Sequence, residues 1–262
     1  MKLGGQDYVL SRSDGTMRVL GIDPSLTNYG WAVHDTDATG IARCPVRGRF
    51  RSLASTLFID RYVGMREDLR ALVREVQPDR IGLEFPVFNN LFSEGMYGLF
   101  LYTCEALKME GCDVVFWSPL QVKAHARDSL GRPPKWQMMK PDMVAAAKAD
   151  TGGKGKWNHN EADAYLVGRL AGRFWSFLDG KLTEDGLTAT ERKYFAGVHT
   201  YTSGKRAGEE VRSGVMYRED ERFFRWSNNF TEIENGSGTE EEDGRRVDDG
   251  GLGSIEEGAQ DG

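Results

Sequence analysis

Three acidic residues adjoin apolar stretches of the sequence, where burying a charge without a partner costs free energy. Asp23 ends the apolar run at 19–22 and Glu84 ends the run at 81–83. Asp163 shares one helical face with apolar residues at +3, +4, +7, +11 and +14, namely Leu166, Val167, Leu170, Phe174 and Phe177. A carboxylate in such surroundings needs a positive partner. The spacing therefore predicts that these acids serve a charged ligand.

The chemistry that fits such a set is metal-assisted hydrolysis. Three carboxylates brought together repel one another, and a bound divalent cation relieves that repulsion. A ligand set of oxygens alone suits Mg²⁺ or Mn²⁺. Two such ions could activate a water and stabilise the leaving oxygen of a phosphodiester. The alternatives are a solvated turn residue for Asp23 and a helix-dipole acid for Asp163.

The elements that would position these acids describe an α/β domain. A hairpin is predicted within 18–33 from the apolar runs at 19–22 and 31–33, which flank a turn, and a further strand at 53–59. Helical spacing, with Tyr97 and Leu101 among the core-facing residues, and apolar runs then alternate along the chain. They predict strands at 80–84 and 113–117, and helices at 61–76, 94–110, 121–130, 141–150 and 158–178. This order predicts a mixed five-stranded sheet flanked by helices.

The charge of the 262-residue chain is unevenly distributed. Its net charge is −6, but residues 231–262 hold eleven acids and two arginines, a net of −9, so residues 1–230 carry +3. This acidic tail is poor in large apolar residues and is predicted to be disordered. A flexible arm is expected at 1–17, and residues 179–230 are expected to pack on the domain or on a partner.

The sequence lacks membrane and zinc signals. No apolar run approaches the ~20 residues of a membrane span, and the start has no apolar signal segment. The three cysteines form no CxxC pair, and with four scattered histidines they give no zinc pattern. We therefore expect a soluble, cytoplasmic protein that makes no membrane contact.

Four motifs in order resemble the RuvC-like Holliday-junction resolvases of the ribonuclease H-like superfamily. They are Gly-Ile-Asp-Pro-Ser at 21–25 with Tyr-Gly at 29–30, Gly-Leu-Glu at 82–84, Ser-Pro-Leu-Gln-Val-Lys at 118–123 and Asn-Glu-Ala-Asp-Ala at 160–164. The resemblance covers about 18–178. It implies a ribonuclease H-like nuclease domain with Asp23, Glu84 and Asp163 as catalytic metal ligands. It further implies a bacterial or bacteriophage homodimer that uses Mg²⁺, with Mn²⁺ as a substitute, and resolves four-way DNA junctions by paired nicks.

The sequence departs from this family at the fourth active-site position. The family has Asp or His three residues before the last acid, where this chain has Asn160. An amide oxygen can ligate a hard cation, but it brings no charge and cannot act as a base. His159, one residue earlier, could instead accept a proton, or could simply be a solvated histidine of the first helical turn.

Basic and aromatic residues near these acids are candidates for DNA contact. Residues 121–156 hold eight basic side chains against three acids, as a phosphate backbone requires. The resemblance implies DNA binding by the helix at 121–130 and the loop after it, through Lys123, Arg127, Arg132 and Lys135. It also implies an aromatic that meets unstacked bases just after the second acid, a role for which Phe85 and Phe88 compete. Each basic residue could instead simply keep a helix surface solvated, and either phenylalanine could instead fill the core.

Two other classes of function remain open on the sequence alone. The actin/Hsp70-like ATPases and sugar kinases share the fold and often open with an apolar strand, an acid and a Gly/Thr/Ser turn. The turn at 24–30 lacks paired phosphate-cradling glycines, and the chain is short for two lobes. The departure at Asn160 also permits a non-catalytic DNA-binding module with a decayed site. Nucleotide binding would identify the first class, and Mg²⁺-dependent nicking would exclude the second.

Overall fold

The computed structural model describes most of the chain between residues 15 and 226. The described residues are 2–3, 6–7, 15–36, 42–52, 57–85, 94–153, 155–195, 198–200, 205, 207–208, 210–212, 215–220, 222–226 and 231–233. The predicted disordered tail therefore lies outside the described residues from 234 onward. None of the described helices is both long enough and apolar enough to cross a membrane.

One mixed sheet forms the centre of the molecule. Its strand order is β12-β11-β10-β7-β6-β3-β4-β5. The pairs β3/β6 and β6/β7 are parallel, whereas β3, β4 and β5 form an antiparallel meander. The five strands expected of the nuclease domain are β3 (Met17–Asp23), β4 (Asn28–Thr36), β5 (Ala42–Arg51), β6 (Arg80–Glu84) and β7 (Val114–Trp117). The predicted α/β class with a mixed sheet is confirmed.

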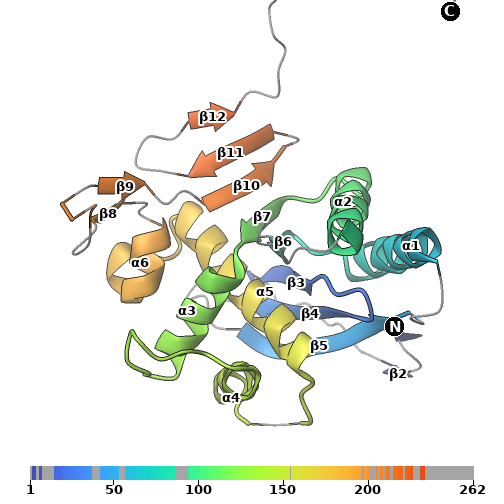
Figure 1. The fold of residues 1–262 in the computed structure, drawn as a ribbon, viewed down its shortest axis with the longest axis horizontal. Helices are drawn as coiled ribbons and strands as arrows, with labels where there is room; N and C mark the ends of the chain where they lie inside the picture. Colours follow the sequence, from blue (N-terminus) through green and yellow to red (C-terminus); the bar gives the residue numbers. More distant parts are fainter. Residues whose placement is uncertain are drawn as a thin grey trace, which may run out of the picture.

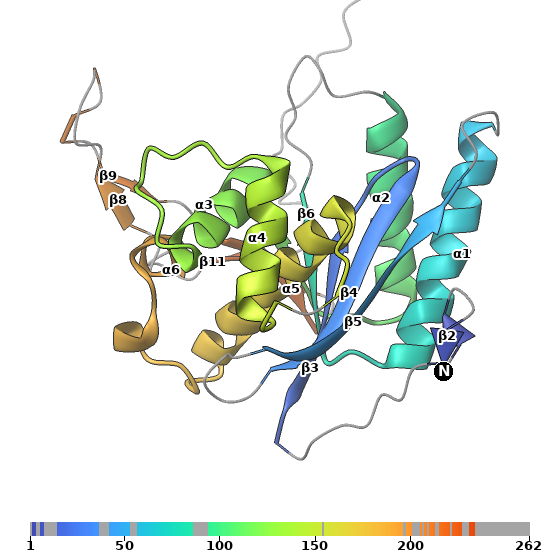
Figure 2. The ribbon, with the colours of Figure 1, turned by 90° about the horizontal axis from the view of Figure 1, so that it is seen from below.

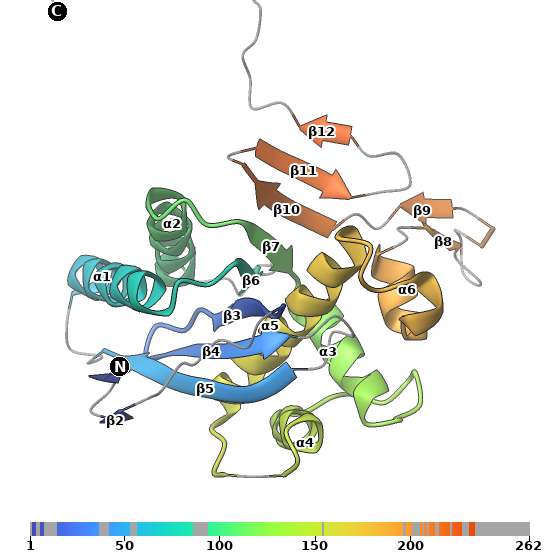
Figure 3. The same ribbon diagram turned by 180° about the vertical axis from the view of Figure 1, so that it is seen from behind.

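The C-terminal extension continues this sheet. Strand β10 (Val215–Glu219) pairs antiparallel with β7, and β11 (Arg222–Trp226) and β12 (Thr231–Ile233) follow it outward (Figure 3). The extension also holds a separate pair, β8 (Val198–Thr200) with β9 (Glu210–Arg212). Near the N-terminus, β1 (Lys2–Leu3) pairs with β2 (Gln6–Asp7).

Helices cover both faces of the sheet (Figures 1 and 2). On one face lie α1 (Phe58–Val76) and α2 (Glu94–Met109), which pack against each other. The other face carries α3 (Pro119–Ser129), α4 (Lys140–Asp150), α5 (His159–Leu178) and α6 (Ala189–Phe195), with a short 3-10 turn at Glu184–Gly186. Helix α5 makes the most contact with the sheet, chiefly with β3, β4 and β6.

Two predictions about these elements were wrong. The third strand is β5, at 42–51; of the strand predicted at 53–59, residues 58 and 59 begin α1 and 53–56 lie outside the described residues. Strand β5 is the edge strand and alternates arginine with other residues, so it has no apolar run to signal it. On α2, Tyr97 and Leu101 are 46% and 47% exposed instead of facing the core. That helix is apolar around much of its circumference, and Leu99, Phe100 and Leu107 take the buried positions.

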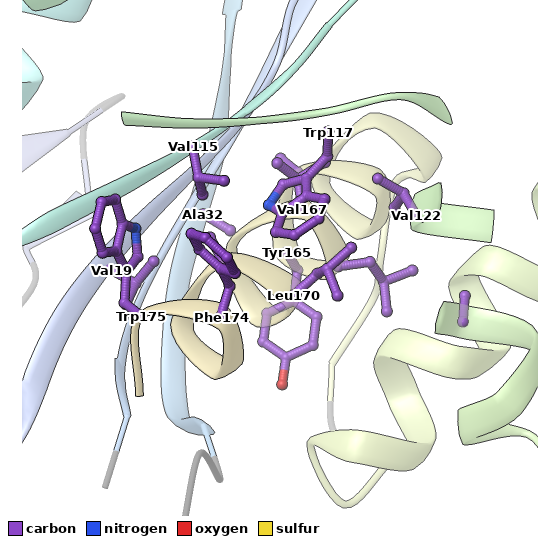
Figure 4. Packing of buried hydrophobic residues seen from close by; sticks show 14 of the residues in the cluster. Val19, Ala32, Val115, Trp117, Val122, Tyr165, Val167, Leu170, Phe174 and Trp175 are labelled. Atoms are coloured by element: carbon purple, nitrogen blue, oxygen red, sulfur yellow. The ribbon is translucent and has the colours of Figure 1, made fainter. Parts of the chain in front are cut away.

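The sheet separates two apolar clusters, one on each face. The first lies between the sheet and helices α3 to α6, and Figure 4 shows it around α5. In it, Trp117 of β7 meets Phe174 of α5 edge to face, with ring centroids 5.6 Å apart. Residues of the extension join the same cluster, because Phe195 and Tyr217 also contact Phe174. The extension thus completes the core of the domain that precedes it.

A buried ion cluster ties the extension to two helices of the domain. Glu191 of α6 is 0% exposed and accepts hydrogen bonds from Arg173 of α5 through both carboxylate oxygens. His125 of α3 places Nδ1 3.2 Å from Glu191 Oε1. Burial alone would raise the pKa of Glu191, but the hydrogen bonds and charges of His125 and Arg173 outweigh it and hold that pKa well below its usual range.

Removing the charge of Glu191 should therefore destabilise the fold strongly. We expect Glu191→Gln to lower the free energy of unfolding by about 3–5 kcal/mol, because it leaves the buried Arg173 without its counter-ion. Urea unfolding measures this. The matched control is Glu184→Gln in the exposed 3-10 turn, which should change stability by less than about 0.5 kcal/mol. Equal effects of the two substitutions would contradict the stabilising role of the cluster.

Candidate active site

Two of the three predicted acids lie side by side at one edge of the sheet. Strands β3 and β6 are parallel neighbours with Ile22 opposite Leu83, so Asp23 and Glu84 follow at adjacent strand ends. Ligand sites of open α/β sheets commonly lie at such carboxyl ends. Both side chains are partly buried. The topology thus brings together two acids that are about 60 residues apart in the sequence.

The third acid reaches this edge because α5 packs unusually close to the sheet. A Cβ atom at Gly21 would lie 2.0 Å from the carbonyl oxygen of Ala164, and one at Gly30 would lie 2.3 Å from that of Asn160. Only glycine allows a helix backbone to approach a strand this closely. Asp163 lies between these two contacts, one turn inside α5, and so faces the strand ends. Its position on the buried face, predicted from helical spacing, is confirmed.

The start of α5 is fixed by its own cap and by β4. Asn158 Oδ1 accepts a hydrogen bond from the backbone N–H of Asn160 at 2.9 Å, and Glu161 accepts one from the N–H of Asn158 at 3.4 Å. The two hydrogen bonds form a reciprocal cap of the helix start. The Asn160 side chain, 7% exposed, donates from Nδ2 to the carbonyl oxygen of Asn28 at 2.5 Å. At the fourth position the amide therefore anchors the helix to the first residue of β4.

The three carboxyl groups all have raised pKa values, chiefly because they are buried. Burial raises the pKa of Asp23 well above its usual value, and the charges of Glu84 and Asp163 raise it further. Burial, followed by the charge of Asp163, raises the pKa of Glu84 to about 8. Burial raises the pKa of Asp163 to about 6, against the opposing charges of Lys123 and Lys140. Perturbed carboxyl groups that interact in this way are typical of functional sites.

Two lysines provide positive charge beside these acids. Lys123 of α3 lowers the pKa values of Glu84 and Asp163, and Lys140 of α4 lowers those of Asp23 and Asp163. Both side chains are exposed. The sequence predicted Lys123 but did not single out Lys140, which belongs to no motif and is only one of eight basic residues in its region. Its position at the first residue of α4 brings it to the carboxylates.

The donor set suits a hard divalent cation. All the candidate ligands are carboxylate oxygens, and Oδ1 of Asp163 is buried without a hydrogen-bond partner. As the side chains stand, no group of three or more His, Cys, Asp or Glu within the described residues is close enough to hold a metal ion. Ligation by all three acids therefore requires their side chains to turn toward one another.

The other residues predicted to contact DNA have more varied surroundings. Arg127 donates to the carbonyl oxygen of Pro134 at 2.7 Å and so braces the loop after α3. Arg132 lies over the ring of Trp136, 4.8 Å from its centroid, and Lys135 is exposed on the same loop.

The two candidate aromatics differ in what the structure describes. Phe85 packs edge to face on Phe100 and Phe116, with centroid distances of 5.2 Å and 6.2 Å, and is half-buried. Phe88 lies outside the described residues. The described neighbours of Phe85 therefore favour a packing role for it, and base stacking by Phe88 stays a prediction.

His159, the first residue of α5, lies in a positively charged setting. Burial, followed by the charges of Lys140 and Arg49, lowers its pKa below the usual value for histidine, although a side-chain hydrogen bond with Asn160 acts the other way. The imidazole is therefore neutral at neutral pH and keeps a nitrogen lone pair that can accept a proton.

Comparisons with known proteins identify the fold. No protein-family model matches the chain. A curated protein, crossover junction endodeoxyribonuclease RuvC of Synechocystis sp. (strain ATCC 27184 / PCC 6803 / Kazusa), is 29% identical over 80 residues, which are 30% of this chain and 48% of the relative. The chain thus matches about half the length of that relative.

Two solved structures cover a larger share of the chain. Thermus thermophilus RuvC in complex with Holliday junction substrate aligns with a TM-score of 0.52 at 18% identity, over 63% of this chain and 97% of that one. A second Thermus thermophilus RuvC structure gives 0.51 at 17% identity, over 63% and 98%. This chain has the RuvC fold. The ribonuclease H-like architecture expected from the motif order is confirmed, and the RuvC fold spans fewer residues than the chain contains.

The raised carboxyl pKa values predict how stability depends on pH. The folded state holds a proton on Glu84 that the unfolded state releases, so its stability falls as pH rises from about 4.5 to about 8. In EDTA at pH 8.5 we expect Glu84→Gln to raise the melting temperature by at least about 3 °C, since one pKa unit is about 1.4 kcal/mol. At pH 4 the two proteins should melt together.

A matched substitution separates this effect from a general loss of negative charge. Glu75 is exposed near the end of α1, just before β6 begins and so at the opposite end of that strand from Glu84, and Glu75→Gln should leave the pH profile of the melting temperature unchanged. If Glu84→Gln melted below the unchanged protein at pH 8.5, the like-charge repulsion described above would be disproved.

Proposed function

We propose that this protein is a metal-dependent endonuclease that cleaves phosphodiester bonds in branched DNA, and that it resolves four-way junctions by paired nicks. The observation that supports the proposal is that Asp23 and Glu84 end adjacent strands of a RuvC fold, while Asp163 of α5 lies near enough for its charge to raise the pKa values of both. Burial raises the pKa values of all three, and repulsion by a neighbouring carboxylate adds to it at Asp23 and Glu84. A hard divalent cation bound among these carboxylates would offset their negative charge.

Each residue has a distinct role in this proposal. Asp23, Glu84 and Asp163 hold the divalent ions, for which we propose Mg²⁺, replaceable by Mn²⁺, and two ions per site. When bound, such ions supply an activated water and stabilise the leaving oxygen. Lys123 offers an ammonium group to the phosphate beside the acids.

Two further side chains act at the start of α5. Asn160 orients the helix, because its amide already donates to β4 and cannot serve as a base. The neutral imidazole of His159 accepts a proton at that side of the site.

The substrate and the assembly are proposed from different observations. A RuvC of the same fold has been solved with a Holliday junction, which supports branched DNA as the substrate. Paired nicks on two strands need two active sites, and hence two copies of the chain. Phe58 and Ile59 of α1, which are 54% and 50% exposed, and the exposed Tyr97 and Leu101 of α2 are an apolar surface that fits a second copy.

Cleavage of a labelled four-way junction tests this function. In Mg²⁺ the protein should nick the junction much faster than the matched duplex, and EDTA should stop the reaction. We expect Asp163→Asn to lower the cleavage rate by at least about 100-fold, since a lost metal ligand removes several kcal/mol of transition-state stabilisation. Asp185→Asn, an exposed control in the 3-10 turn, should cleave normally.

Each alternative function predicts a different result in the same assay. Junction binding without Mg²⁺-dependent nicking would overturn the proposal in favour of the non-catalytic module that Asn160 permits. ATP binding without junction cleavage would favour an actin/Hsp70-like ATPase. Equal cleavage of junction and duplex would keep the nuclease but reject branched DNA as its preferred substrate.

A further inference from the structure

Strand β5, which is outermost in the sheet, carries a row of arginines that leads toward the strand ends where the acids lie. Arg47, Arg49 and Arg51 stand at alternate positions, so their side chains share one face of the sheet. Arg49 pairs with Gly30, which in turn pairs with Asp23. Arg49 therefore lies in the same row of the sheet as the first acid, two strands away, which is about 10 Å at the usual strand spacing. Arg51, the last residue of β5, lies one step nearer the catalytic end.

The first turn of α5 shows which way this row faces. Arg47 and Arg49 lie 3.5 Å and 3.4 Å from the carboxylate of Glu161, so the row faces the side of the sheet that α5 covers. Asn160, near the start of α5, contacts the sheet at Gly30, level with Arg49. Arg51 pairs with Asn28, beyond that level, and its side chain is exposed.

The charge of Arg49 reaches the candidate active site. Its Nη1 donates to Asn28 Oδ1 at 3.2 Å, and the backbone oxygen of the same Asn28 accepts from Asn160. After burial and Lys140, Arg49 also contributes to the lowered pKa of His159. The guanidinium group thus lies beside the fourth position, on the β5 side of the carboxylates. Lys123, which acts on Glu84 and Asp163, provides positive charge from α3.

Two arginines share one carboxylate here. The distances from Arg47 and Arg49 to Glu161 exceed the ~2.7–2.9 Å of a tight charge-assisted hydrogen bond. Arg47 is held further by Trp157, with its guanidinium carbon 3.6 Å from the ring centroid. Glu161 brings one negative charge to Arg47 and Arg49, and Arg51, one step beyond them in the row, is exposed.

We propose that Arg49 and Arg51 bind the phosphate backbone of the nucleic acid on the β5 side of the carboxylates. The scissile phosphate would then lie between lysines from α3 and α4 and arginines from β5. A guanidinium group can donate two parallel hydrogen bonds to a phosphate, which makes arginine well suited to this contact. Glu161 holds Arg49 in place and competes with the phosphate for it. This inference rests on the nuclease function proposed above, because it assigns a contact to that same substrate.

The salt dependence of binding tests this contact. The full-length protein is titrated with labelled four-way junction and with matched duplex, at 50–300 mM salt, with Ca²⁺ in place of Mg²⁺. Each lost phosphate contact reduces the slope of log K against log salt by about 0.9. We expect that reduction for Arg49→Gln and for Arg51→Gln. Glu161→Gln should have the opposite effect and bind DNA more tightly, because it removes the carboxylate that competes with the phosphate. Glutamine also serves in this type of helix cap, so the start of α5 should be preserved.

A matched arginine provides the control. Arg74 of α1 is 58% exposed in its side chain and is ion-paired, but it lies near the end of the sheet where β3 and β6 begin. Arg74→Gln should keep the slope of the unchanged protein. The row would be structural only, and the inference overturned, if Arg49→Gln and Arg51→Gln also kept that slope.

Two results separate this inference from other failures. If Arg49→Gln lost stability because Glu161 lost a partner, the exposed Arg51→Gln would decide alone, with its fold checked by melting temperature. If the unchanged protein neither bound DNA nor cut it in Mg²⁺, the nuclease function itself would be overturned. If it cut DNA while the arginine variants kept its slope, only the β5 contact would be lost.

Discussion

The candidate active site depends on how closely one helix approaches the sheet. Carboxyl groups on two strands and a helix can meet only if the helix backbone lies nearly against the strands. Glycines at 21, 30 and 82 make this possible, since a Cβ at any of them would come within 2.8 Å of an atom of α5. Gly168 on the helix meets Gly21 from the other side. This contact sets the depth of α5, and its first turn, capped by Asn158 and anchored through Asn160, then fixes the rotation that aims Asp163 at the strand ends.

Bringing these acids together costs stability, and the surrounding structure offsets it. Burial, followed by the charge of Asp163, raises the pKa of Glu84 to about 8, so the folded chain binds a proton where the proposed function needs a carboxylate. Groups that keep an unfavourable arrangement at a functional site persist because the rest of the fold holds them. Here the holding elements are the apolar clusters on the two faces of the sheet, in which Trp117 of β7 packs against Phe174 of the helix that carries Asp163. Proton and cation are thus alternative ways of relieving the same repulsion.

Sequence patterns predicted the acids more easily than their neighbours. Asp23, Glu84 and Asp163 each interrupt an apolar pattern, so local periodicity was enough to find them and to place two on strands and one on a helix face. Strand β5 gave no such signal because an edge strand pairs on one side only and here alternates with arginine. Lys140 was missed because its role comes from the packing of α4, which no local pattern encodes. The buried cluster of His125, Arg173 and Glu191 joins three helices, and charged residues of this kind look like surface residues in a sequence.

The C-terminal extension changes what the shared fold can do on its own. In a five-stranded sheet β7 would be an edge with unpaired backbone groups, whereas here β10 satisfies them and moves the edge outward to β12. The extension also contacts two helices of the site. Glu191 joins α3, which carries Lys123, to α5, which carries Asp163. Lys123 and Asp163 come from separate helices, so the distance between them depends on how α3 and α5 are held together. The extension is therefore part of the framework that sets the charge balance at the carboxylates, although none of its described residues stands among them.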